Sequence, residues 1–196
     1  MRARPAAFFD RDGVICEYVP ELADLSQFKF RSGVALAIQK LNQAGYFVFV
    51  ATNQPNIAKA KMTVAENDRI HKYMVEELAR QGASIDEVFY CPHRVGGVIP
   101  SLSIECECRK PRPGMLKQAL QKYGFSMEKS FMLGDTWRDV DCAHQFGIKG
   151  LAVCGGGGYP YSLYEDSAKD SLNVKPDGIF SGPLEAVEHW LGGELI

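Results

Sequence analysis

Residues 8–18 read FFDRDGVICEY and place two aspartates, Asp10 and Asp12, directly after a short apolar run. A continuous apolar run that gives way to polar residues is typical of a strand that is buried on both faces and ends in a turn. Residues two apart on an extended backbone point to the same side, so both carboxylates should face one point. The stretch therefore predicts a buried strand whose end carries two acidic groups.

The same pattern recurs along the chain, where short apolar runs alternate with segments of helical period. The apolar runs cover residues 6–9, 46–51, 87–90, 130–134 and 150–153. The helical segments cover residues 33–45, 63–82, 114–124, 138–147 and 183–191. This alternation predicts an α/β fold, in which a doubly wound parallel sheet is flanked by helices and joined by right-handed crossovers.

Length, composition and charge limit the classes of function. With 196 residues and 46% hydrophobic content, the chain should form a single domain over residues 1–196. The formal net charge is −2, and no block of like charge indicates a nucleic-acid partner. No apolar run approaches the roughly 18 residues needed to cross a bilayer, and the first ten residues lack a signal-peptide core. We expect a cytoplasmic monomer without a membrane partner, in which the six cysteines do not form structural disulfides.

Polar side chains follow several of the predicted strands at the edge where such a sheet binds its ligands. Carboxylates that gather there repel one another unless a cation lies among them, and a hard divalent ion such as Mg²⁺ suits oxygen ligands. Mg²⁺ and a lysine would neutralise the charge of a phosphoryl group, while a threonine would donate a hydroxyl hydrogen bond. The residues expected at this edge are Asp10, Asp12, Thr52, Asn53, Lys110 and Asp135.

A second group of residues has the spacing of a metal site. Cys91-x-His93 and Cys106-x-Cys108 supply three sulfurs and one imidazole, a complete tetrahedral set for a structural Zn²⁺. The alternative is a pair of buried cysteines with a surface histidine and a chance neighbour. A zinc loop over residues 91–108 would fix the direction of the two cations that follow, Arg109 and Lys110.

Four motifs occur in an order and at a spacing that resemble a known superfamily. They are DRDG (10–13), TNQ (52–54), CRKPRPGM (108–115) and GDTWRD (134–139). The chain resembles the haloacid-dehalogenase-like superfamily of aspartate-nucleophile phosphatases. Its CPH (91–93) and CEC (106–108) pairs are similar to the zinc loop of the branch that contains heptose-bisphosphate 7-phosphatases and histidinol-phosphate phosphatases.

The resemblance implies a role for each residue at the sheet edge. Asp10 would attack phosphorus and become an aspartyl phosphate, and Asp12 would act as general acid and then as general base. Mg²⁺ would be held by the Asp10 carboxylate, the Asp12 backbone carbonyl and Asp135. Thr52 and Asn53 would bind phosphoryl oxygens or nearby substrate.

For the cations, the resemblance implies that Lys110 neutralises charge and that Arg109 recognises the substrate. The favoured reaction is removal of the 7-phosphate from D-glycero-D-manno-heptose 1,7-bisphosphate. The short gaps between the motifs leave no room for a large cap domain, so the site should be open and accept small phosphorylated metabolites.

Several features leave alternatives open. Lys59 and Thr136 stand where the heptose enzymes typically carry arginine and lysine, so recognition of a second substrate phosphate is uncertain from the sequence. Asp139 is either a supporting carboxylate or an exposed acid of a helix start, and the glycine loop at 154–160 is expected at the edge of the site. Rival functions are a histidinol-phosphate phosphatase, a promiscuous sugar-phosphate phosphatase and an inactive zinc-stabilised binding protein.

Overall fold

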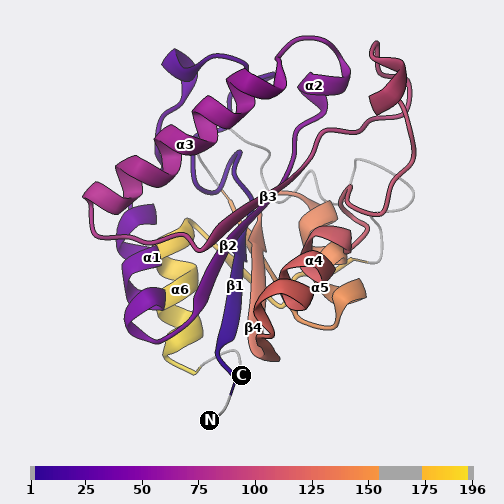
Figure 1. Cartoon of the computed structure of the whole chain (residues 1–196). Helices are drawn as coiled ribbons and strands as arrows, with labels where there is room; N and C mark the ends of the chain where they lie inside the picture. Colours follow the sequence, from indigo (N-terminus) through magenta and orange to yellow (C-terminus); the bar gives the residue numbers. More distant parts are fainter. Residues whose placement is uncertain (1–2, 155–173, 194–196) are drawn as a thin grey trace.

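The strands form one parallel sheet in the order β3-β2-β1-β4-β5-β6 (Figure 1). The computed structural model describes residues 3–154 and 174–193. The strands are β1 (Pro5–Phe9), β2 (Phe47–Asn53), β3 (Glu87–Cys91), β4 (Ser126–Gly134), β5 (Lys149–Val153) and β6 (Gly178–Phe180). All five strand pairings are parallel, which confirms the predicted sheet.

Helices cover both faces of this sheet, as the doubly wound prediction requires. Figure 1 shows α1, α3 and α6 beside one face and α4 and α5 beside the other. The helices are α1 (Val34–Gln43), α2 (Pro55–Ala58), α3 (Val64–Arg80), α4 (Gly114–Tyr123), α5 (Trp137–Phe146) and α6 (Pro183–Leu191). Two short 3₁₀ helices, η1 (Leu25–Gln27) and η2 (Pro100–Leu102), lie in the connections.

The continuous apolar runs are explained by burial of the strands on both faces. In β1, Ala7 and Phe9 pack into the core on the side of α1, α3 and α6, while Ala6 and Phe8 pack into the core under α4 and α5. None of these four side chains is exposed to solvent. A strand between two helical layers has no polar face, so apolar residues occur at every position.

The described helix ends follow their capping residues. Thr63 precedes α3 and forms a capping box with Glu66, in which each side chain bonds the other residue's backbone N–H. The prediction placed this helix at 63–82, and it ends two residues earlier, at Arg80.

α2 and β6 were not predicted, because elements of four and three residues are too short to reveal a period.

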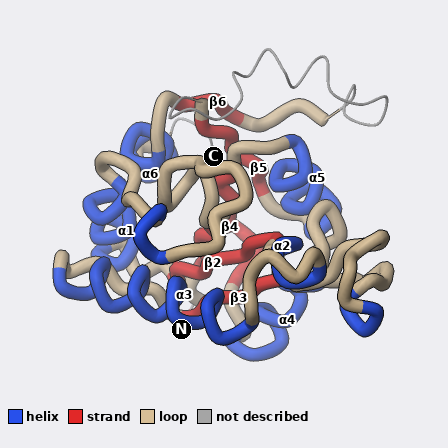
Figure 2. The backbone as a smooth tube through the Cα atoms, turned by 90° about the horizontal axis from the view of Figure 1, so that it is seen from above, coloured by secondary structure: helices blue, strands red, loops and turns tan. Residues whose placement is uncertain are grey.

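The strand order places β1 and β4 side by side, with the rest of the chain running outward from them in opposite directions. This is the topological switch point, where doubly wound sheets open a crevice beyond the carboxyl ends of their strands. Asp10 follows β1, and its N–H donates to the carbonyl of Leu133 in β4 at 2.9 Å. In the view down onto this edge, loops lie over the strand ends (Figure 2).

None of the helices in the described ranges is both long and apolar enough to span a lipid bilayer.

Candidate active site

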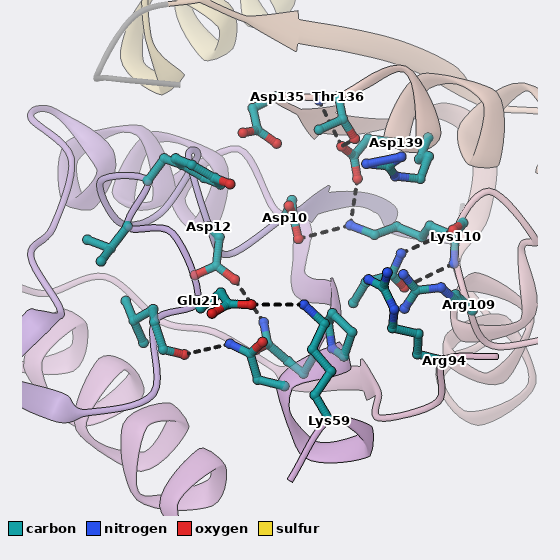
Figure 3. A pocket seen from close by; sticks show the side chains of 18 residues that line it. Asp10, Asp12, Glu21, Lys59, Arg94, Arg109, Lys110, Asp135, Thr136 and Asp139 are labelled. Carbon is teal, nitrogen blue, oxygen red and sulfur yellow. Dashed lines mark hydrogen bonds and ion pairs between the residues drawn. The ribbon is translucent and has the colours of Figure 1, made fainter. Parts of the chain in front are cut away.

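Asp10 lies at the centre of a cleft at the carboxyl edge of the sheet (Figure 3). Its side chain is only 12% exposed. Burial raises the pKa of Asp10 to about 6, assisted by the neighbouring carboxylates of Asp139 and Asp12 and opposed by Lys110. Asp10 therefore ionises at a higher pH than a free aspartate does.

Lys110 is buried below the cleft and supplies the opposing positive charge. Its Nζ donates to the carbonyl of Ala51 at 2.7 Å and to Asp139 Oδ1 at 2.5 Å, and it lies 2.9 Å from Asp10 Oδ1. Burial alone would lower the pKa of this lysine, but the carboxylates of Asp10 and Asp139 raise it above its usual range. Lys110 is therefore a permanent cation with 2% of its side chain exposed.

Asp139 proves to be a buried supporting carboxylate rather than an exposed acid. It lies in the first turn of α5 with 1% of its side chain exposed. Oδ1 accepts from Lys110, while Oδ2 accepts from the backbone N–H of Thr136 at 3.1 Å and from its hydroxyl at 2.7 Å. Both oxygens are occupied, so Asp139 joins the start of α5 to the buried lysine.

Asp10, Asp135 and Asp139 bring carboxylate oxygens within 4.8 Å of one another. Because Asp139 is saturated by protein donors, Asp10 and Asp135 supply the oxygens that remain. Asp10 Oδ1 is buried and receives no hydrogen bond of proper geometry, its contact with Lys110 being an ion pair. Burial, followed by the charges of Asp10 and Asp139, raises the pKa of Asp135 well above its usual value. This donor set fits a hard divalent cation such as Mg²⁺.

Gly13 allows Asp135 to approach Asp10. Its backbone has φ +82°, and a Cβ atom at this position would lie 2.2 Å from Asp135 Oδ2. A side chain would therefore be strained and would also displace the carboxylate. The glycine of the DRDG motif is explained by this close approach.

Asp12 is held by a buried arginine that the sequence analysis did not single out. Arg11 Nε donates to Asp12 Oδ1 at 3.1 Å and Nη2 donates to Oδ2 at 3.0 Å. Gln54 Nε2 also donates to Oδ2, at 2.8 Å. The Arg11 side chain is 1% exposed, whereas that of Asp12 is 23% exposed and lines the cleft. A two-point contact of this kind fixes the plane of the carboxylate.

Three further side chains complete the surroundings of Arg11. Its guanidinium lies 2.9 Å from Gln54 Oε1, 3.4 Å from Asn67 Oδ1 and 3.2 Å from His71 Nε2. Burial and the adjacent Arg11 lower the pKa of His71 to about 3, so its ring is neutral and can accept a hydrogen bond. The only sequence signal was polar Asn67 and His71 four apart on the apolar stripe of α3.

Thr52 and Asn53, at the end of β2, are both hydrogen-bonded within the protein. Thr52 is 1% exposed, and its Oγ1 accepts from Gln54 Nε2 at 3.0 Å. The Asn53 side chain bonds both the N–H and the carbonyl of Lys110, each at 3.0 Å. Asn53 therefore fastens the Lys110 backbone to β2, and direct contact of either residue with a substrate stays a prediction.

The predicted metal loop brings its four residues together. Cys91, at the end of β3, lies with His93, Cys106 and Cys108 so that one ligand atom of each falls within 4.8 Å of the others. All three cysteines are free thiols, and hydrogen bonds from Cys91 and Cys106 lower the pKa of Cys108 to about 5. A thiolate among two thiols and an imidazole is a donor set that suits Zn²⁺.

Arg109 follows this loop directly and also contacts it. Its Nη1 donates to the carbonyl of His93 at 3.0 Å. The side chain lines the cleft, and its contact with a substrate stays a prediction. The contact links the metal-binding group to a cation of the cleft.

The cleft has a volume of about 280 Å³. The segment after β1 and the metal loop both contribute to its walls, through Tyr18, Glu21 and Arg94 among others. The predicted residues that line it are Asp10, Asp12, Asn53, Arg109, Lys110 and Asp135. Lys59, which the sequence analysis related to a second phosphate, also lines it, and so do two cations that the analysis did not mention, Arg94 and Arg138. The glycine loop at 154–160 lies outside the described residues beyond Cys154.

Comparisons with known proteins agree with this fold. The model of the HAD-hydrolase-like family matches residues 107–181. The chain is 41% identical to the D-glycero-beta-D-manno-heptose-1,7-bisphosphate 7-phosphatase of Rhodopseudomonas palustris, over 76% of this chain and 82% of that protein. It is 34% identical to the D-glycero-alpha-D-manno-heptose-1,7-bisphosphate 7-phosphatase of Photorhabdus laumondii, over 72% of this chain and 78% of that protein.

Among solved structures, the D,D-heptose 1,7-bisphosphate phosphatase of B. bronchiseptica, in complex with magnesium and phosphate, is similar over nearly the whole chain. The TM-score is 0.80 at 27% identity, covering 96% of this chain and 99% of the other. The family match and these relatives support a phosphomonoester hydrolase, with which a carboxylate cluster around a buried lysine is consistent. The chain belongs to the HAD-like hydrolases, in the family of the heptose-bisphosphate phosphatases.

The raised pKa of Asp10 predicts how the stability of the metal-free protein depends on pH. Asp10 ionises near 3.8 when unfolded and near 6 when folded. Between these values the folded state holds more protons, so this group's contribution to the free energy of unfolding decreases as pH rises from about 4 to about 6. We expect urea denaturation in EDTA to reveal this decrease, and added Mg²⁺ to oppose it.

Asp10→Asn is the control for this measurement, because the amide does not titrate. As pH rises from about 4 to about 6, the free energy of unfolding of the parent should fall relative to that of the variant. A difference that is constant with pH, or that moves in the parent's favour, would contradict the raised pKa.

Proposed function

We propose that this chain is a Mg²⁺-dependent phosphatase that removes the 7-phosphate of D-glycero-D-manno-heptose 1,7-bisphosphate through an aspartyl-phosphate intermediate. The observation that carries the proposal is the placement of Asp10 between buried Lys110 and Asp135 at the switch point of the sheet. The names and coverage of the relatives support the choice of substrate. Because those relatives act on different anomers, both anomers are candidates.

In the first displacement, the Asp10 carboxylate attacks phosphorus, and the bond between phosphorus and the sugar oxygen breaks. Asp12 gives its proton to the departing oxygen. Arg11 and Gln54 hold the Asp12 carboxylate toward the cleft, so the proton is presented from a fixed direction. The positive charge of Lys110 opposes the negative charge that gathers on the phosphoryl group.

In the second displacement, water attacks the aspartyl phosphate, Asp12 accepts the proton of that water, and Asp10 is released. Asp139 and Asn53 act on this step indirectly, because they hold the side chain and the backbone of Lys110. Both displacements thus use the same pair of carboxylates in the same positions. Thr52 would donate its hydroxyl to a phosphoryl oxygen.

Two metal ions belong to the proposal. The Asp10 and Asp135 carboxylates, with the Asp12 backbone carbonyl, would hold Mg²⁺, which when bound neutralises phosphoryl oxygens. Cys91, His93, Cys106 and Cys108 would hold a structural Zn²⁺, since four protein ligands leave no position for substrate. Because Arg109 donates to the carbonyl of His93, an ordered zinc loop would hold the Arg109 side chain in position for the substrate.

We further propose that residues 1–196 form one domain and that the protein acts as a cytoplasmic monomer on a small phosphorylated metabolite. The cleft volume of about 280 Å³ supports a substrate of that size. The described residues form a single sheet with one helical layer on each face.

The substrate is tested by release of inorganic phosphate in Mg²⁺. The substrates to compare are both anomers of the heptose 1,7-bisphosphate, histidinol phosphate and fructose 1,6-bisphosphate. We expect kcat/KM for one heptose anomer to exceed that for each non-heptose substrate by about 10²-fold or more, which is about 2.7 kcal/mol of transition-state stabilisation. A preference for histidinol phosphate, or equal rates on all of them, would contradict the heptose assignment.

Asp10→Asn separates an enzyme from a binding protein. Without a nucleophile, the rate of phosphate release should fall about 10³-fold or more. Asp141→Asn is the matched control, because among the described residues Asp141 accepts a hydrogen bond from Gln145, one turn further along α5, and it lies outside the cleft, so it should retain the parental rate. No phosphate release from the parent protein would favour a binding protein.

The zinc site is tested with Cys106→Ser. We expect this variant to lose bound zinc and to show a raised KM, because Arg109 depends on the order of the loop. Cys154→Ser is the control, since Cys154 lies outside the four-residue group and should keep one zinc per chain. Metal content by mass spectrometry provides the measurement, and an unchanged zinc content in Cys106→Ser would exclude the proposed ligand set.

A further inference from the structure

The buried side chain of Arg11 contacts helix α3 as well as Asp12. Its Nε and Nη2 atoms donate to the Asp12 carboxylate, and Nη2 also donates to Gln54. The remaining nitrogen, Nη1, lies 3.2 Å from His71 Nε2 and 3.4 Å from Asn67 Oδ1, both in α3. Each nitrogen of the guanidinium group therefore has at least one acceptor, and those of Nη1 come from an element outside the cleft.

The contact with Arg11 determines the tautomer of the His71 ring. A guanidinium group only donates hydrogen bonds, so Nε2 must accept and the ring proton must lie on Nδ1. The other tautomer would let Nδ1 accept from Asn67 Nδ2 at 3.4 Å, but it would place two donors 3.2 Å apart. The shorter contact, from a charged donor, is the stronger one. Burial, assisted by the charge of Arg11, lowers the pKa of His71 to about 3 and keeps the ring neutral.

The position of Asp12 depends on this one guanidinium group. The Asp12 side chain is 23% exposed at the cleft, and its Oδ2 accepts from Arg11 and from Gln54 Nε2. Gln54 is itself held by Arg11, whose Nη2 donates to its Oε1 at 2.9 Å. Without an acceptor in α3, the buried Nη1 would be unpaired, and the group would turn toward another acceptor or water. The plane of the Asp12 carboxylate would then no longer be fixed.

We propose that His71 is a positioning residue for proton transfer: by accepting a hydrogen bond from Arg11, it keeps the Asp12 carboxylate directed at the leaving oxygen of the substrate. This inference rests on the proposed function, because it concerns the general acid of the same reaction. His71 does not line the cleft, so it acts only through Arg11. Helix α3 therefore contributes to the chemical step without meeting the substrate.

This role predicts a dependence on the leaving group of the phosphate ester. A sugar oxygen needs the proton of Asp12 as its bond to phosphorus breaks, whereas p-nitrophenolate is a stable anion that leaves without one. Loss of the acceptor should therefore slow the sugar ester far more than p-nitrophenyl phosphate. A residue that only stabilises the fold would affect both esters by the same factor, because Asp10 and Lys110 act on the phosphoryl group of each.

The test compares kcat/KM for heptose 1,7-bisphosphate and for p-nitrophenyl phosphate, using the full chain with Mg²⁺ and zinc. This constant reports the first displacement, and the ratio of the two values does not depend on how much of the protein is folded. We expect His71→Phe to lower the ratio of sugar ester to aryl ester about 10-fold or more. His71→Gln should recover most of the ratio, because its amide oxygen can accept from Arg11.

Met74→Ala is the matched control, because Met74 is buried in the apolar core one turn further along α3. The resulting cavity should lower the free energy of unfolding and leave the ratio at its parental value. If the parent prefers histidinol phosphate or fructose 1,6-bisphosphate, that ester replaces the heptose, since each releases an alcohol.

The inference is overturned if His71→Phe lowers both values of kcat/KM by the same factor. It is equally overturned if His71→Gln hydrolyses the sugar ester no faster than His71→Phe does. Failure of the proposed function gives a different result, in which the parent protein releases no phosphate from any of these esters.

Discussion

The buried ammonium of Lys110 is the interaction on which the site depends. It joins the carbonyl of Ala51 in β2, the carboxylate of Asp10 after β1 and the carboxylate of Asp139 in α5. Without this cation, Asp10 and Asp139 would be negative charges with almost no access to water, a state that costs several kcal/mol. Asn53 holds the backbone of the same lysine. Three elements that are distant in sequence are thus set in position by one charged atom.

Around this lysine, each group proposed to act in the reaction is held by another that does not. Arg11 orients Asp12, Asp139 and Asn53 hold Lys110, and Gly13 makes room for Asp135. After these contacts are made, two sets of charges remain incompletely neutralised among the described residues. The oxygens of Asp10 and Asp135 require a cation, and the arginines at the wall of the cleft require an anion. A divalent metal and a bisphosphorylated sugar would satisfy both requirements, which is why the charge distribution and the names of the relatives lead to the same class of reaction.

The sequence was sufficient for the sheet and for the gathering of the candidate site residues at one edge, because both follow from order along the chain. Apolar runs located five of the six strands, and in a parallel sheet the residues that end each run, such as Asp10 and Asp135, meet at one edge. The contacts that hold these residues could not be predicted. Whether Arg11 turns toward solvent or toward His71 depends on how α3 packs over the loop after β1. Side-chain partners of this kind are determined by packing, which has no signature in the spacing of residues.

The measurement that tests the account most directly is the free energy of unfolding of Lys110→Met, obtained by urea denaturation beside Lys122→Met. Lys122 pairs with Glu87, but its side chain is 59% exposed. If Lys110 holds the site together, its replacement should cost about 3–5 kcal/mol, whereas the exposed pair should cost no more than about 1 kcal/mol. If the two variants unfold at the same urea concentration, the buried lysine is not what organises the carboxylates, and the account of this site is wrong.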